Sequence, residues 1–244
     1  MRSLLYYVAN LDDLIDITDD ADVKAKYHGM VDVLIPIAKG YVSDRAYDVC
    51  NMGMQVYGGY GYIREYPQEQ LVRDCRITMI YEGTNGIQAM DLLGRKLGMN
   101  EGRPIMDLMG EIQKIIARAK QNPATAELGK KLDEALNKLG EVAMYMGATA
   151  MSPKALDAFA SAYPFMEVAG DVVLGWMLLW RAVIASEKLA GKPKKKDVVF
   201  YEGQVKTADF FIGTMLPTTL GKMNSILGGN NAVNAISEDA FGGK

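Results

Sequence analysis

Helical periodicity constrains this chain more than any other feature of its sequence. Apolar residues recur at three- and four-residue spacing along most of the 244 residues, and the alternation typical of strands is scarce. Helical segments are expected at about residues 2–10, 40–57, 67–77, 85–97, 104–120, 124–150, 153–190 and 198–220, and a further helix between the first two carries Val23 to Ile35. The sequence therefore predicts an all-α fold.

Local signals suggest where these helices begin and end. Asp20 can cap the second helix, and Pro36 should kink or end it. The run GGYGY should break the third helix, and TMIYEGTN should be β-prone or irregular. Thr84 or Asn85 can cap the helix that follows. The run MNEGRP is typical of a linker, so we expect two helical units, residues 1–100 and 101–244.

Composition and a few single residues argue against several classes of protein and of site. A net charge of −3 argues against general nucleic-acid binding. The isolated thiols Cys50 and Cys75 indicate a reducing compartment, so a cytoplasmic location is expected. The apolar stretch VVLGWMLLWRAVIA carries Arg181, is too short to span a bilayer and should be a buried helix. His28 has no neighbouring ligand set, so no metal site is expected. The 16 methionines should mainly fill gaps in the core.

Three consecutive segments carry a family resemblance. They are QVYGGYGYIREYP at 55–67, QLVRDCRI at 70–77 and IYEGTNGIQ at 80–88. In this order they resemble the C-terminal signature of flavin-dependent acyl-CoA dehydrogenases, over roughly residues 1–98. The form YEGTNGIQAMDLLGRKL resembles the methylmercaptopropionyl-CoA dehydrogenase-like subgroup. The resemblance implies an acyl-CoA dehydrogenase C-terminal helical bundle, followed by the additional helical extension of that subgroup.

The resemblance implies that Glu82 is the base in α,β-dehydrogenation of an acyl-CoA thioester. In the family a carboxylate takes the α-proton, the β-hydrogen passes to FAD, and electrons continue to an electron-transfer flavoprotein. A dry pocket raises a carboxylate pKa and makes it a stronger base. The backbone N–H of Glu82 would help to stabilise the enolate, Gly83 would let substrate approach, and Tyr81 would form part of the pocket wall. Local sequence alone favours a surface carboxylate in a turn, and only the flanking motifs favour catalysis.

The resemblance also assigns cofactor contacts. Thr84 would touch the phosphate region of FAD, although its hydroxyl could equally be only a helix cap. Gln55, Gly58 and Gly59 match a segment that contacts the FAD of a neighbouring subunit, which implies a homo-oligomer, although GGYG runs are often only turns. Gly86 departs from the commoner family pattern. Nearby, Asp74 is expected to pair with an arginine.

The family also has an N-terminal helical domain and a middle β domain, and neither is found in this sequence. We therefore expect that FAD is not retained by this chain alone, and that catalysis by the chain alone is incomplete. The alternative is a helical oligomerisation or assembly fragment that is inactive without those domains.

Overall fold

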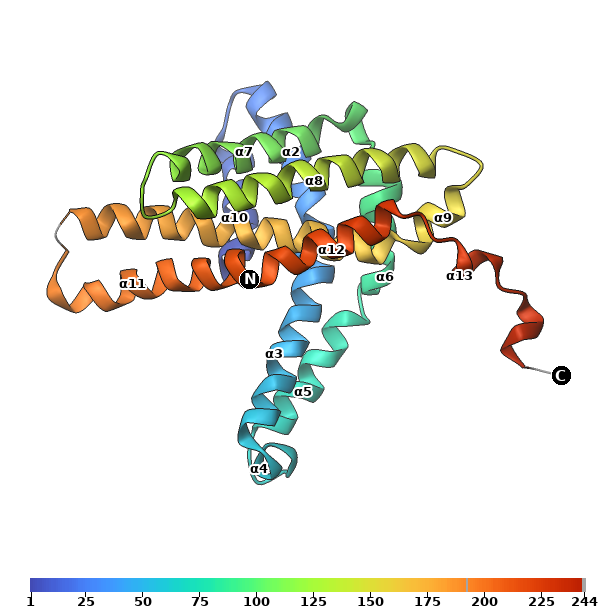
Figure 1. The fold of residues 1–244 in the computed structure, drawn as a ribbon, viewed down its shortest axis with the longest axis horizontal. Helices are drawn as coiled ribbons and strands as arrows, with labels where there is room; N and C mark the ends of the chain where they lie inside the picture. Colours follow the sequence, from blue (N-terminus) through green and yellow to red (C-terminus); the bar gives the residue numbers. More distant parts are fainter. Residues whose placement is uncertain (192, 243–244) are drawn as a thin grey trace.

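The computed structural model describes residues 1–191 and 193–242, and within them it contains helices and no strand (Figure 1). The all-α prediction is confirmed. The main helices are α1 (Arg2–Ile17), α2 (Ala21–Pro36), α3 (Val42–Tyr57), α5 (Gln68–Arg76), α6 (Asn85–Asp91), α7 (Arg103–Lys120), α8 (Ala126–Ala150), α10 (Ala162–Ala190), α11 (Lys195–Phe210) and α12 (Leu216–Leu227). Shorter helices are α4 (Gly59–Tyr62), α9 (Ala155–Ala160) and α13 (Ala232–Ala235). Five-residue π-helical segments are η1 (Ile37–Tyr41), η3 (Leu92–Lys96) and η5 (Phe211–Met215).

The first helices confirm one expected boundary and correct another. The Asp20 carboxylate accepts the N–H groups of Asp22 and Val23, at 2.9 and 3.1 Å, and so caps α2. The α-helix ends at Pro36, one of the two outcomes expected there, and the π-helical segment η1 follows at once and leads into α3. A wider π turn is one way in which a helix absorbs a local irregularity. The first helix is also longer than the expected 2–10, since α1 runs to Ile17.

Helices α3 and α5 form an arm that projects from the rest of the molecule, with α4 at its tip (Figure 1). Gly58 ends α3 with φ 61°, a conformation that glycine adopts readily, so GGYGY breaks the helix as predicted. The Gln68 amide donates to the Cys50 carbonyl at 2.6 Å, and the Arg76 guanidinium lies 5.5 Å from the Tyr47 ring centre. These contacts join the two helices of the arm.

Helix α10 is the centre of the fold and packs against α1, α6, α7, α8, α11 and α12. Its 29 residues are long and apolar enough to cross a membrane, so the sequence argument from length was wrong. However, 72% of its most apolar stretch is buried within the protein, which is typical of a central bundle helix. The prediction that VVLGWMLLWRAVIA is a buried helix is therefore confirmed.

One hydrophobic core extends across residue 100. It includes Leu4 and Leu34 before that point and Phe165 and Trp176 after it, and each of these side chains is at most 1% exposed. The ring of Tyr7 on α1 lies edge-on to Trp176 at 5.0 Å. The division into two domains at residue 100 stays a prediction. The residues before and after that position share one hydrophobic core.

Some apolar residues are less buried than their helical spacing predicts. Ile87 and Met90 share one face of the helix at 85–97 by their spacing, yet they are 52% and 48% exposed. The buried positions there are Ala89, Leu92 and Leu93. The methionines likewise divide into two groups. Some fill the core, as predicted, while Met106, Met144 and Met151 are exposed.

Candidate functional site

The predicted site residues fall into two groups, at opposite ends of the arm. Tyr81, Glu82, Gly83 and Thr84 form a turn at its base, directly before α6. Gln55, Gly58 and Gly59 lie at its tip, around the end of α3 (Figure 1). Sixteen residues of α3 separate the ends, a distance of about 24 Å. Within one chain, the structure does not bring the two groups together.

The turn at the base of the arm has an unusual backbone. Glu82 adopts φ 53° and Gly83 adopts φ 80°, so two consecutive residues lie in the left-handed region. That region is uncommon for any residue other than glycine and is often found at functional sites. Tyr81, Glu82, Gly83 and Thr84 are all exposed in this chain, and Tyr81 is 50% exposed. Among the described residues, the Glu82 N–H has no hydrogen-bond acceptor.

Side chains from outside the turn hold its carbonyl groups. The Lys39 ammonium donates to the Gly83 carbonyl at 2.6 Å and to Asn85 Oδ1 at 2.9 Å. The Gln88 amide makes a longer contact, 3.5 Å, with the Glu82 carbonyl. Partial desolvation lowers the pKa of Lys39, and the nearby charges of Asp44 and Glu82 oppose that shift. Glu82 therefore lies near a cation that is anchored to its own turn.

The buried side chain of Asn85 connects the beginning of α6 to the end of η1 and the start of α3. Its side chain is only 4% exposed, and its amide nitrogen donates to the Gly40 carbonyl, Ser43 Oγ and Asp44 Oδ1, at 3.0, 2.9 and 2.8 Å. Thr84 caps the helix, as predicted, by accepting the Ile87 N–H at 3.3 Å. From the sequence, Asn85 was predicted only as a possible cap, and the buried hydrogen bonds of its side chain were missed.

Sequence reasoning also missed Lys39, Asp44 and Tyr163. Asp44 is 6% exposed, and its second carboxylate oxygen accepts the Tyr163 hydroxyl from α10. Burial first, and then the hydrogen bond to Asp44, raise the pKa of Tyr163. These residues are 119 positions apart in the chain. A polar residue inside an amphipathic helix carries no local signal that it faces another helix, so only the fold identifies this pair.

The tip of the arm is open and apolar. Gln55, Gly58 and Gly59 are exposed, and a Cβ atom added at either glycine would meet no atom within 4 Å. Exposed apolar side chains surround them: Val56 is 85%, Tyr60 63% and Tyr62 76% exposed. An exposed apolar surface of this kind is typical of an interaction site.

Asp74 lies on α5. It accepts the Gln70 amide at 2.6 Å instead of pairing with an arginine, which corrects that expectation.

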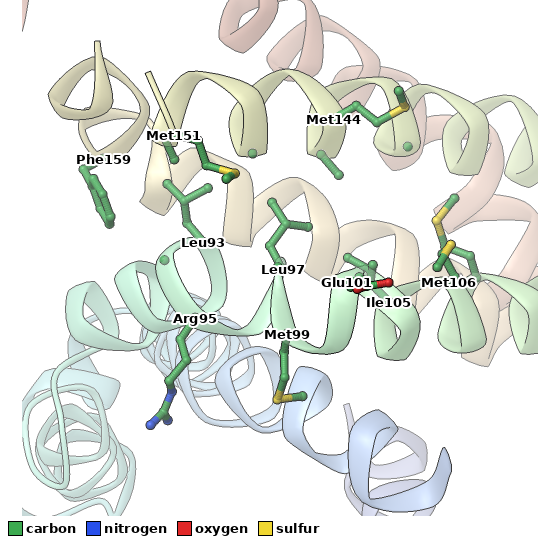
Figure 2. A pocket seen from close by; sticks show the side chains of 18 residues that line it. Leu93, Arg95, Leu97, Met99, Glu101, Ile105, Met106, Met144, Met151 and Phe159 are labelled. Carbon is green, nitrogen blue, oxygen red and sulfur yellow. The ribbon is translucent and has the colours of Figure 1, made fainter. Parts of the chain in front are cut away.

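A large, mainly apolar hollow in the described part of the molecule lies elsewhere. It has a volume of about 960 Å³ and lies between η3, the start of α7 and the end of α8 (Figure 2). Leu93, Leu97, Ile105, Met144 and Phe159 are among its apolar lining residues. None of the predicted site residues lines it. The size of a hollow is therefore no guide to the candidate site in this chain.

No cluster of three or more potential metal ligands occurs among residues 1–191 and 193–242. Neither Cys50 nor Cys75 is in a disulfide. The arrangement instead offers a carboxylate, a free backbone N–H and an anchored turn. A carboxylate beside a free N–H can take a proton from a carbon acid while the N–H stabilises the developing oxyanion.

Comparisons with known proteins match the two parts of the chain to two family descriptions. Residues 3–97 match the family described as acyl-CoA dehydrogenase, C-terminal domain. Residues 108–237, more than half of the chain, match the family described as acetyl-CoA dehydrogenase C-terminal like.

Three similar proteins agree with these matches. A butyryl-CoA dehydrogenase of Syntrophomonas wolfei is 32% identical over 98% of this chain and 39% of its own length. A 3-methylmercaptopropionyl-CoA dehydrogenase of Ruegeria pomeroyi is 34% identical over 80% of this chain and 33% of its own length. The caffeyl-CoA reductase–Etf complex subunit CarC of Acetobacterium woodii is 46% identical over 25% of this chain and 16% of its own length. The chain thus spans about two fifths of the length of the butyryl-CoA dehydrogenase.

Proposed function

Because the chain belongs to the acyl-CoA dehydrogenase family, we propose that it is the part of such an enzyme that carries the catalytic base, Glu82. The reaction is α,β-dehydrogenation of an acyl-CoA thioester. The observation that carries this proposal is the anchored left-handed turn at Glu82, with a free N–H beside its carboxylate.

Glu82 takes the α-proton of the substrate through its carboxylate. The Glu82 N–H is free to donate to the thioester carbonyl, where negative charge develops. Tyr81 is placed to contact the acyl group, and Gly83 leaves space for the substrate. FAD, when bound, supplies the acceptor for the β-hydrogen as hydride.

The residues at the tip of the arm suit a cofactor contact. Gln55 is exposed, and the open space at Gly58 and Gly59 permits close approach of another molecule to the backbone. Thr84 would contact the FAD phosphate region from the base of the arm. Because the two ends of the arm are far apart, each arm would contribute to two sites in a homo-oligomer, one in its own subunit and one in a neighbour.

Three further assignments are proposed, two from the names of relatives and one from the thiols. The CarC relative is named as a subunit of an Etf complex, which supports an electron-transfer flavoprotein as the electron acceptor. The two free thiols, Cys50 and Cys75, suit the reducing environment of the cytoplasm. The acyl-CoA substrate is supported by the names of the butyryl and 3-methylmercaptopropionyl relatives.

The decisive experiment replaces Glu82 by Gln. The chain is combined with separately produced N-terminal helical and β domains, and acyl-CoA dehydrogenation is assayed with an artificial electron acceptor. We expect Glu82→Gln to lower turnover at least about 100-fold, because a positioned base contributes about 10²- to 10⁴-fold. FAD content and melting temperature should not change, because Glu82 is exposed.

The matched control is Glu202→Gln, an exposed glutamate on α11, which should leave turnover unchanged. Turnover by Glu82→Gln equal to that of the unmodified chain would contradict the assignment of the base.

A second candidate function is an assembly fragment without activity. The exposed apolar side chains along the arm favour it, since Val49, Met52 and Leu71 are each more than half exposed. Under this hypothesis, Glu82→Gln has no effect on any activity of the assembled protein, whereas Leu71→Asp weakens self-association.

A further inference from the structure

The strained turn at Glu82 needs support from outside itself. Glu82 and Gly83 are both exposed and both left-handed, so apolar packing does not fix them. The left-handed conformation is unfavourable for a residue other than glycine. Such a conformation persists only where surrounding contacts determine it. The contacts that could do so are the hydrogen bonds to the carbonyl groups of the turn and to Asn85.

Those hydrogen bonds form one connected chain of polar groups. Lys39 binds the Gly83 carbonyl and Asn85 Oδ1, at 2.6 and 2.9 Å. Asn85 in turn donates to Asp44 at 2.8 Å, and Asp44 accepts the hydroxyl of Tyr163. Asn85 and Asp44 are 4% and 6% exposed, so water does not compete strongly with these bonds. The chain of groups runs from the turn into the protein and ends on α10.

Its last member comes from a distant part of the sequence. Tyr163 lies in the first turn of α10, within the region that matches the second family, 108–237. A second contact connects α10 to the segment directly before α3, because Asp171 of α10 accepts the hydroxyl of Tyr41, the last residue of η1, at 2.5 Å. Tyr41 is 1% exposed. Helix α10 is therefore fixed to the π-helical segment from which Lys39 and Gly40 reach the turn.

We propose that Tyr163, Asp44, Asn85 and Lys39 are positioning residues through which helix α10 holds the Glu82 turn in its left-handed conformation. The catalytic consequence rests on the proposed function of Glu82. The region at 108–237 thus has a direct role in the site, because its Tyr163 is the last member of the chain of hydrogen bonds that holds the Glu82 turn. None of the four side chains needs to contact substrate.

The first test measures the turn itself, in the whole 244-residue chain. Backbone ¹⁵N relaxation should give order parameters near 0.85 for Glu82 and Gly83, as for a rigid backbone. In Tyr163→Phe, Asp44 loses one partner, and these order parameters should fall below about 0.6 while those of α7 and α8 stay unchanged. Tyr6→Phe, which alters a tyrosine that is 70% exposed, is the control and should change nothing. Unchanged order parameters at Glu82 and Gly83 in Tyr163→Phe would overturn the proposal.

Lys39 provides a second, more accessible variant if Tyr163→Phe does not fold. Lys39→Met removes the donor to Gly83 and should loosen the same two residues. Lys39→Arg keeps a cation with several donors and should restore most of the rigidity. Equal rigidity in the Met and Arg variants would contradict the role assigned to Lys39.

The last test connects the support to catalysis, in the chain combined with the N-terminal and β domains. Tyr163→Phe should lower kcat about tenfold to a hundredfold with little change in KM, because a small misplacement of a catalytic group slows turnover. A looser turn with unchanged kcat would support the structural role and contradict Glu82 as the base. A rigid turn would instead reject the support while leaving the base assignment intact. The two proposals can therefore fail separately.

Discussion

At the scale of single residues, Glu82 combines an exposed carboxylate with a backbone conformation that is unfavourable for it. The motif YEGTN identifies the residue, but no local pattern indicates φ 53° at a glutamate. Side chains from elsewhere, above all Lys39 and Asn85, make that conformation possible. Stability and function are then expected to favour different residues at position 82.

Glu82→Gly tests that conflict. Glycine adopts left-handed φ values without the steric cost but loses more entropy on folding. The balance should raise the free energy of unfolding by up to about 1 kcal/mol, measured by urea denaturation. Glu202→Gly, in the middle of exposed α11, should instead lower it by about 1 kcal/mol. If Glu82→Gly were clearly less stable than the unmodified chain, the side chain of Glu82 would have to make a stabilising contact.

At the scale of helices, close packing between α10 and η1 positions the site. Gly170 lies directly against the Tyr41 ring, and a Cβ atom there would come within 2.3 Å of it. Tyr41 ends the π-helical segment that carries Lys39 and Gly40 to the turn. π-Helical segments are rare and frequently occur at functional sites. Glycine is therefore required at position 170 because a larger residue would clash with the Tyr41 ring, and not because of the backbone conformation.

Gly170→Ala should destabilise the protein by about 1–3 kcal/mol, because the added methyl group overpacks a buried ring. Thermal or urea unfolding measures this difference. Gly110→Ala is the matched control: it lies in α7, and an added Cβ atom would meet nothing within 4 Å. It should stabilise the protein by roughly 0.5–1 kcal/mol, the usual gain in helix propensity. Equal effects of the two substitutions would contradict the packing described for α10.

At the scale of the whole molecule, the regions matched to two family descriptions share one core. Leu4 and Leu34 from the first region and Trp176 from the second are buried in the same cluster. Meanwhile, the projecting arm and the Glu82 turn are exposed. The body of the molecule is thus closely packed around one core, while the arm and the Glu82 turn remain exposed.

The chain should therefore unfold in one cooperative transition, with far-UV circular dichroism and the fluorescence of Trp176 and Trp180 giving the same midpoint. Residues 1–100 alone should stay largely unfolded, because the partners of Leu4 and Leu34 are missing.

Purified alone, the 244-residue chain should be colourless, since its cofactor contacts are exposed and far apart. Two separate transitions, or a yellow preparation with stoichiometric flavin, would contradict this description.

Much of the fold could be predicted from the sequence, because helical periodicity and caps are local properties. The all-α class, the cap at Asp20 and the break at Gly58 were predicted correctly on this basis. Predictions that depended on the surroundings of a helix were less successful. Ile87 and Met90 have the spacing of one helical face but are exposed, whereas Ala89 on the same helix is buried.

The sequence by itself determined the helical segments, the family and the identity of the candidate base, because these depend on residues that are near one another in the chain. Only the tertiary structure decided how that base is held. Tyr163 and Asp44 are 119 residues apart, and their hydrogen bond exists because α10 packs against η1, the segment that leads directly into α3. Contacts between such distant positions follow from the packing of whole helices around a common core, and no local pattern specifies them.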